Sequence, residues 1–206
     1  MAKIKFISVL KQGSGRMEDV VFSSWKGRLF MKPYKKQRAT FTDGQQEIRN
    51  SFTATSKNWK SLAGIVCASW EEHAEGRVMT GYNAFMGENI NPHRAGKMLT
   101  LCMSMGMEPL AGFTATTGTG PGVIEARFSP VNGGKHVAFF VQKKEDAVTG
   151  GSILFVNGGM DLPSPFKITG MESGTEYHVY AVVTDKAYTE AASVSASVSA
   201  SAVAGA

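Results

Sequence analysis

The feature that most constrains the fold is a series of short strand candidates in the second half of the chain. From Gly112 onward, brief runs rich in β-branched and aromatic residues recur, and Gly-rich turns separate several of them. This spacing is typical of an all-β sandwich, in which short antiparallel strands form two packed sheets. The sequence predicts strands at residues 112–117, 122–128, 136–143, 152–156, 165–170, 176–184 and 192–200.

The segment from Phe166 to Val182 makes this prediction more specific. Its sequence, F-K-I-T-G-M-E-S-G-T-E-Y-H-V-Y-A-V, resembles the E and F strands of fibronectin type III domains. The resemblance implies that Tyr177 is a tyrosine-corner residue, whose hydroxyl bonds back to the backbone and fixes the crossing between the sheets. The tryptophan usual in that family is missing from the second strand, so we expect Ala126 or Phe128 to fill the core there.

The last residues alternate between serine and small apolar residues. Residues 192–202 read A-S-V-S-A-S-V-S-A-S-A, so a strand there places Val194, Ala196 and Val198 on one face and serines on the other. Two interpretations stay open. The strand either completes the sandwich within the chain or pairs with a neighbouring subunit, because an unpaired strand edge favours strand addition.

The first half of the chain predicts a β-hairpin followed by helices. Residues 18–34 contain two arms rich in β-branched and aromatic residues, and Gly27 is expected to supply the positive φ of the turn between them. Residues 97–107 alternate and predict a further strand. Between these segments, helical spacing predicts apolar faces at Ile48, Phe52, Trp59 and Leu62, then at Ile65, Val66, Ser69, Trp70 and His73, and then at Tyr82, Phe85, Met86 and Ile90.

Together these patterns predict two domains. Residues 1–108 form an α+β unit, a β-hairpin plus two or three short helices, and residues 109–206 form an all-β, fibronectin type III-like sandwich. The length of 206 residues agrees, because single domains usually contain about 100–150 residues. The net charge also differs between the two halves. Residues 1–110 contain 16 Lys/Arg and nine Asp/Glu, whereas residues 111–206 contain six Lys/Arg and eight Asp/Glu.

A basic and aromatic stretch in the first half is the best candidate for a contact surface. No acidic residue lies between Val20 and Thr42. Interleaved cations and rings suit nucleic acid, and they equally suit an acidic patch on another subunit. The third interpretation is a solvated sheet face whose aromatic rings pack under the helices. The candidate residues are Trp25, Lys26, Arg28, Phe30, Lys32, Tyr34, Lys35, Lys36 and Arg38.

No pattern indicates an enzyme active site. The sequence contains no G-x-S-x-G, H-E-x-x-H or G-K-[ST] motif, and its four histidines are scattered. The pair Glu72-His73 is expected on a helix surface, and residues 118–122 are expected to form a turn rather than a phosphate cradle. Cys67 and Cys102 are expected as buried thiols. We therefore expect no catalysis, no cofactor, no metal site and no small-molecule substrate.

Several motifs of the first half resemble a family of uncharacterised bacterial and phage-associated proteins. These motifs are S-S-W-K-G at residues 23–27, W-K-S-L at residues 59–62, Trp70, and G-Y-N-A-F at residues 81–85. The family pairs such a hairpin and W-x-x-L helix with a C-terminal β domain. The resemblance implies an architecture and carries no known activity.

The expected function follows from these points. We expect a non-enzymatic structural subunit of a multi-copy assembly, a phage virion or a filament, whose first unit contacts other copies and whose sandwich decorates the surface. The alternative is a nucleic-acid-binding protein that uses the basic face at residues 26–38. Expected partners are copies of itself, other particle proteins or nucleic acid. We expect synthesis in the cytoplasm without a signal peptide, a final place in a virion or extracellular assembly, and no membrane span.

Overall fold

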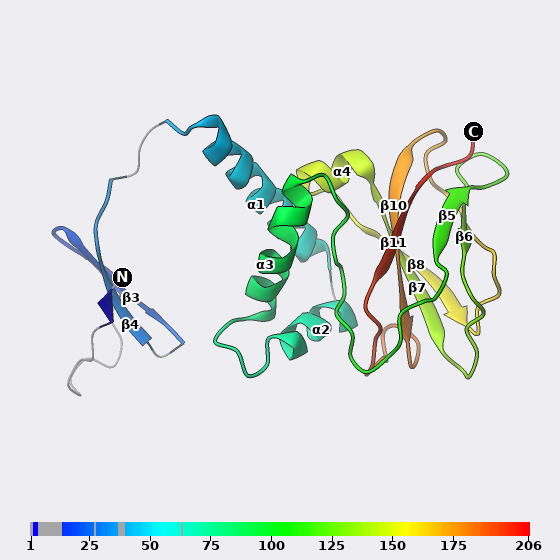
Figure 1. The fold of residues 1–206 in the computed structure, drawn as a ribbon, viewed down its shortest axis with the longest axis horizontal. Helices are drawn as coiled ribbons and strands as arrows, with labels where there is room; N and C mark the ends of the chain where they lie inside the picture. Colours follow the sequence, from blue (N-terminus) through cyan, green and yellow to red (C-terminus); the bar gives the residue numbers. More distant parts are fainter. Residues whose placement is uncertain (1, 4–13, 27, 37–39, 63) are drawn as a thin grey trace. The chain divides into compact units, whose positions relative to one another are not determined.

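A computed structural model of the chain describes residues 2–3, 14–26, 28–36, 40–62 and 64–206. The chain forms two compact units, Met1–Thr42 and Asp43–Ala206, which we call unit 1 and unit 2. In Figure 1, the strands of unit 1 are blue, and the helices and sheets of unit 2 run from cyan to red.

Within its described residues, unit 1 is a four-stranded antiparallel sheet in the order β1-β4-β3-β2. The hairpin predicted for residues 18–34 is confirmed, because β3 pairs with β4 from Val20 opposite Pro33 to Trp25 opposite Arg28. Lys26 in the turn has φ 45°, in the positive range that two-residue hairpin turns use. Gly27 lies outside the described residues. The strands are β1 (Ala2–Lys3), β2 (Gly15–Met17), β3 (Val20–Trp25) and β4 (Arg28–Pro33).

Unit 2 begins with the predicted helices, α1 (Asp43–Ser61), α2 (Ile65–His73) and α3 (Gly81–Arg94). Gly64 lies between α1 and α2 and has φ 59°, a conformation that glycine adopts readily. Thr80 caps α3, because its side-chain oxygen accepts a hydrogen bond from the Asn83 amide at 3.2 Å. The helix continues through Pro92 to Arg94, since a proline in the last turn removes only one backbone donor.

The predicted apolar face of α1 is half wrong. Leu62, just after the helix, is buried, and Trp59 packs against the same core, but Ile48 and Phe52 are each 47% exposed. The residues that α1 does bury are small or polar, namely Ser51, Ala54, Thr55 and Asn58. Close approach of the helix to residues 150–151 explains this choice, because a Cβ on Gly150 would lie 2.6 Å from the Ala54 carbonyl oxygen.

The strands of unit 2 form two facing antiparallel sheets, in the orders β5-β6-β9 and β11-β10-β7-β8. This three-on-four arrangement of seven consecutive strands is that of a fibronectin type III-like sandwich. The seven strands predicted from residue 112 onward are present, although the last runs from Val198 to Val203 rather than over residues 192–200, and the short helix α4 was not predicted. The elements are β5 (Thr114–Thr117), β6 (Ile124–Arg127), β7 (His136–Lys143), α4 (Lys144–Thr149), β8 (Leu154–Met160), β9 (Phe166–Ile168), β10 (Glu176–Thr184) and β11 (Val198–Val203).

The tyrosine corner predicted at Tyr177 is present. The Tyr177 side chain is buried, and its hydroxyl oxygen accepts a hydrogen bond from the Glu172 amide at 3.0 Å. Ala126 and Phe128 are both buried in the core between the sheets, so both of the expected residues fill it. Phe139 lies at the centre of this core and stacks on Phe166 with ring centroids 5.2 Å apart.

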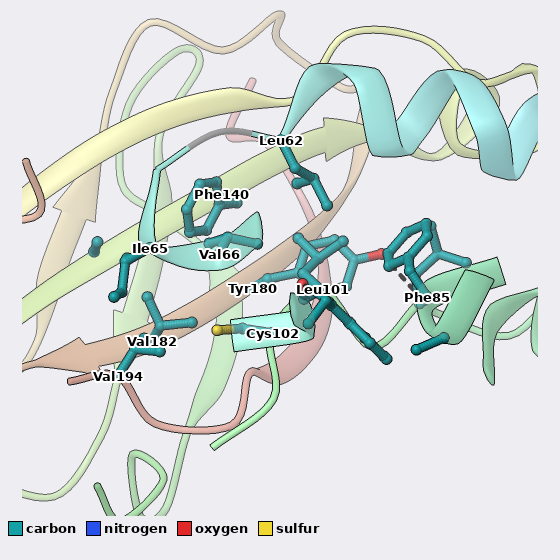
Figure 2. Packing of buried hydrophobic residues seen from close by; sticks show 14 of the residues in the cluster. Leu62, Ile65, Val66, Phe85, Leu101, Cys102, Phe140, Tyr180, Val182 and Val194 are labelled. Atoms are coloured by element: carbon teal, nitrogen blue, oxygen red, sulfur yellow. Dashed lines mark hydrogen bonds between the residues drawn. The ribbon is translucent and has the colours of Figure 1, made fainter. Parts of the chain in front are cut away.

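A second core lies on the other side of the β10–β7 sheet, where the helices cover it. Alternate residues of β10 enter the two cores, so Val179 packs between the sheets while Tyr180 and Val182 face the helices. Figure 2 shows Phe140 of β7 and Tyr180 beside Val66 of α2. Strands buried on both faces read as continuous apolar runs, as β10 does. Because this core joins helices to sandwich, the boundary predicted between residues 108 and 109 falls inside unit 2.

The strand predicted at residues 97–107 is wrong. This segment is extended but makes only one isolated bridge, between Met107 and Ser195. Its backbone is bound partly by residues 194–197, since the Met105 amide donates to the Val194 carbonyl at 2.7 Å and the Ser197 amide donates to the Cys102 carbonyl at 3.1 Å, and partly by side chains of the helices. Asn89 donates to the Thr100 carbonyl and accepts from the Thr100 amide, and the Trp70 indole donates to the Leu101 carbonyl at 2.8 Å.

The alternating tail pairs within the chain. β11 runs antiparallel to β10, with Val198 opposite Ala181, and Val194 forms a bridge with Thr184. Val194 is fully buried and Ala196 is half-buried. A serine of the tail also makes hydrogen bonds within the chain, because the Ser197 hydroxyl accepts from the amides of residues 101 and 102. This arrangement is the first of the two that the sequence left open.

Candidate interaction surface of the N-terminal sheet

The register of unit 1 assigns its side chains to two faces. Residues directly opposite each other in antiparallel strands point to the same side of the sheet. Trp25 lies opposite Arg28, Ser23 opposite Phe30, and Val21 opposite both Lys32 and Arg16. These residues share one face, which we call the basic–aromatic face. The intervening residues Met17, Val20, Phe22 and Met31 share the other, which we call the apolar face.

The basic–aromatic face brings together residues that the sequence predicts as a contact surface. Arg28, Phe30 and Lys32 alternate along β4, as expected from the two-residue period of a strand. Trp25 is 42% exposed and Tyr34 is 39% exposed, so neither ring is packed into a core. The Lys26 ammonium lies 5.6 Å from the centre of the Trp25 ring, within the range of a cation–π contact.

Arg16 belongs to this face and was missed from sequence. Its guanidinium carbon lies 3.6 Å from the centre of the Tyr34 ring, and its Nε donates to the Glu18 carbonyl at 2.8 Å. The contact joins β2 to the end of β4, across the strand between them. Only the strand order of the sheet brings the two residues together, so spacing along the sequence carries no signal for it.

The remaining predicted contact residues come after β4 in the sequence. Lys35 and Lys36 are exposed in the segment after β4, and Arg38 lies outside the described residues. Unit 1 as a whole holds ten Lys/Arg against two Asp/Glu, a net charge of +8. Residues 43–206 hold twelve Lys/Arg against fifteen Asp/Glu, a net charge of −3. The charge asymmetry is therefore larger at the boundary that the structure defines than at the division between residues 110 and 111.

The apolar face carries large side chains that are not fully covered. Met17 is 67% exposed, and Val20, Phe22 and Met31 are half-buried. Among the side chains of unit 1 whose exposure the structure describes, none is buried. Stable domains normally cover the apolar side of a sheet with a second layer. Within its described residues, unit 1 is therefore a single layer with one basic–aromatic and one apolar side.

Several other polar residues and turns of unit 2 have structural contacts. A Glu71 carboxylate oxygen accepts a hydrogen bond from the Gly81 amide at 3.0 Å, and His73 lies 3.3 Å from the Arg77 guanidinium. Residues 118–122 form the turn between β5 and β6, as predicted. The described residues contain no group of three or more metal-ligating side chains. No helix in the described part of the chain is long and apolar enough to span a membrane.

Both cysteines are free thiols, and burial raises the pKa of each. Cys102 is fully buried and its pKa is raised to about 12, with its sulfur 3.3 Å from the Ser69 hydroxyl. Such a thiol stays protonated at neutral pH, and protonated thiols are poor nucleophiles.

Comparison with known proteins bears on the sandwich. No family model and no curated protein matches the sequence, so the resemblance of the N-terminal motifs stays a prediction. Among solved structures, FN3tt matches at 16% identity and TM-score 0.34, over 49% of this chain and 98% of that one. An Fn3-like protein from Clostridium thermocellum matches at 16% identity and TM-score 0.33, over 46% of this chain and 90% of that one.

A family 76 glycoside hydrolase from a bovine Bacteroides thetaiotaomicron strain also matches, at 13% identity and TM-score 0.35. The match covers 47% of this chain and 20% of the hydrolase. These similarities extend over about half of this chain, and the strand order and tyrosine corner define its sandwich independently.

Proposed function

We propose that the chain is a non-enzymatic structural subunit of a multi-copy assembly, a phage particle or a filament, in which unit 1 makes the contacts between subunits. The observation that carries this proposal is the single-layered sheet of unit 1. Its apolar face bears Val20, Phe22 and Met31 without burying any of them. Burying apolar surface stabilises association by roughly 25 cal/mol per Å², so a sheet of this kind gains from a partner layer.

Charge supports a second copy as the partner. Unit 1 carries +8 and unit 2 carries −3, so unit 1 of one copy is attracted to unit 2 of another. Unit 2, by contrast, has cores on both sides of its β10–β7 sheet and is already multilayered. Its sandwich then faces outward and decorates the surface of the assembly. The resemblance to a phage-associated family is the reason for naming a particle or filament.

The test is the oligomeric state of the purified chain and of a matched pair of variants. Light scattering after size exclusion and negative-stain microscopy should show oligomers of the native chain. Phe22→Arg places a charge on the apolar face and should reduce the assembly to smaller species. Ser23→Arg, one residue along the same strand, points to the other face and should leave assembly intact. A strict monomer at high concentration, or equal behaviour of both variants, contradicts the proposal.

The exposed rings of the basic–aromatic face favour a second candidate, binding of single-stranded nucleic acid. The exposed rings of Trp25 and Tyr34 and the half-buried ring of Phe30 lie among cations, and bases stack on such rings while cations contact phosphates. Affinity should then fall steeply with salt. A variant with Lys32, Lys35 and Lys36 all changed to Glu should lose binding in a fluorescence-anisotropy assay. Failure of the native chain to bind DNA or RNA at low salt removes this candidate.

A further inference from the structure

A cavity in unit 2 is lined by polar side chains that the proposed assembly role does not use. It lies where the end of α3, the segment after it, α4 and β10 meet, and its volume is about 120 Å³. This is room for about four water molecules or a small organic molecule. Its walls include His93, Lys97, Leu99, Lys144, His178 and Tyr180.

The main polar wall of this cavity is a buried histidine. His178 is only 7% exposed, and its Nδ1 atom is buried with no hydrogen-bond partner in the described part of the chain. Buried polar groups in proteins almost always have a partner, so a buried histidine that lines a cavity and has an unpaired ring nitrogen is a candidate for binding a ligand. A second imidazole lies nearby, since His93 donates from Nε2 to the Ala147 carbonyl at 3.0 Å and its Nδ1 is also buried without a partner.

The charged residues that line the cavity, Lys97 and Lys144, are both cations. Lys97 is exposed at its rim, and no acidic residue is among the residues that line it. Glu176, the acid closest along β10, is already engaged, because both of its carboxylate oxygens lie 2.9 Å from the Lys144 ammonium. The remaining walls are apolar and come from Leu99, the Tyr180 ring and the side chains of α4.

We propose that this cavity binds a small carboxylate that bears an apolar chain or ring. The carboxylate lies beside His178 and the ammonium group of Lys97, where charge-assisted hydrogen bonds are strongest. The apolar body lies against Leu99, Tyr180 and α4, as ligand sites with mostly apolar walls and few polar groups require.

Binding is coupled to protonation of His178. Burial, and then the positive charge of Lys144, lower the pKa of His178 in the empty cavity, while Glu176 opposes them. The other ionisable groups around the ring are His93, Lys97 and Tyr180, and its strand neighbours Gln142 and Ser201 are neutral. A bound anion favours the imidazolium, so binding takes up a proton and tightens as pH falls.

Three small molecules, each added to the whole protein, distinguish the contribution of the carboxylate from that of the apolar group. Butyrate has both a carboxylate and an apolar chain, 1-butanol has only the chain, and acetate has only the charge. The imidazole and backbone NMR signals of His178 should shift saturably with butyrate and hardly at all with the other two. Affinity for butyrate should rise when pH is lowered from about 7.5 to about 5.5. An absent or unsaturable shift with butyrate, or an equal response to 1-butanol, overturns the proposal.

Variants locate the site. Lys97→Glu changes an exposed side chain and should weaken butyrate binding about threefold without affecting the fold. His178→Gln should weaken it about tenfold and abolish the pH dependence. His136→Gln, on the neighbouring strand β7 and outside the cavity, is the matched control and should leave both unchanged. Equal binding by the native chain and both cavity variants contradicts the assignment.

Discussion

At the scale of single residues, backbone contacts and hydrogen bonds decide how the parts of unit 2 meet. Gly150 shows this most directly. It has φ 78°, and a Cβ there would lie 2.6 Å from the Ala54 carbonyl oxygen, so it allows α1 to approach the turn after α4. Nearby, Gln142 donates to the Asn58 side chain at 2.8 Å and to the Gly151 carbonyl at 3.0 Å. The junction therefore depends on small and polar residues rather than on large apolar ones.

Gly150→Ala is predicted to destabilise unit 2 by about 2–4 kcal/mol, because it combines a strained φ with a backbone clash. Gly170→Ala is the matched control. It has φ 84° but meets no atom within 4 Å, so it should cost only about 1 kcal/mol. Urea unfolding followed by circular dichroism measures both free energies of unfolding. Equal costs for the two variants would show that the close approach to α1 is not present.

Tyr177→Phe is predicted to cost about 1–3 kcal/mol, because it leaves the Glu172 amide without its acceptor at the sandwich corner. Tyr180→Phe should cost less, since the Tyr180 hydroxyl accepts only a long bond of 3.4 Å from the Leu99 amide. The same urea titration compares the two. A larger loss for Tyr180→Phe contradicts this ranking.

His178 is predicted to make the stability of the native chain depend on pH. Burial lowers its pKa in the folded state below the ordinary value of 6.5, so the folded state binds fewer protons than the unfolded state. The free energy of unfolding is therefore highest, as far as His178 is concerned, above about pH 6.5. It falls as pH is lowered from about 6.5 through the folded-state pKa, because the unfolded state then binds the additional proton. His178→Gln should flatten the profile of unfolding free energy between about pH 7 and pH 5. An unchanged profile in that variant would assign the pH dependence to other groups.

At the scale of elements, the sequence predicts what is local and misses what depends on neighbours. The seven strands follow from the two-residue period and Gly-rich turns, and the corner at Tyr177 follows from a contiguous motif. The face of α1 does not follow, because the helix buries polar residues at a close approach. The cation–π contact of Arg16 with Tyr34 was missed because two strands of the sheet separate them in sequence.

The two parts of the predicted apolar face of α1 should therefore respond differently to truncation. Phe52→Ala is expected to change the free energy of unfolding by less than about 0.5 kcal/mol, since this ring is 47% exposed. Leu62→Ala, which empties a buried position just after the helix, is expected to cost about 2–4 kcal/mol. Thermal or urea denaturation distinguishes them. A large loss with Phe52→Ala would indicate that the start of α1 is covered.

At the scale of the whole molecule, unit 2 folds as one body because the helices and the sandwich share a core. Phe140→Ala opens that core on its sheet side and should cost about 3–5 kcal/mol. Hydrogen exchange should show the same loss of protection in α3 as in β7, because the two unfold together. Val78→Ala, at a side chain that is 50% exposed, is the control and should have little effect. Protection lost in β7 alone contradicts a single cooperative unit.

The covered outer face of β7 and β10 has a consequence for the evolution of the chain. Fibronectin type III-like domains with two polar outer faces can be duplicated, shuffled and inserted between unrelated neighbours. Here residues 109–206, once separated from the helices, would present Phe140, Tyr180 and Val182 to water on one face. Such a surface favours aggregation, so the sandwich cannot be transferred without residues 43–108. Transfer of the sandwich to another protein therefore requires the helices as well, and the unit that can be exchanged begins at Asp43.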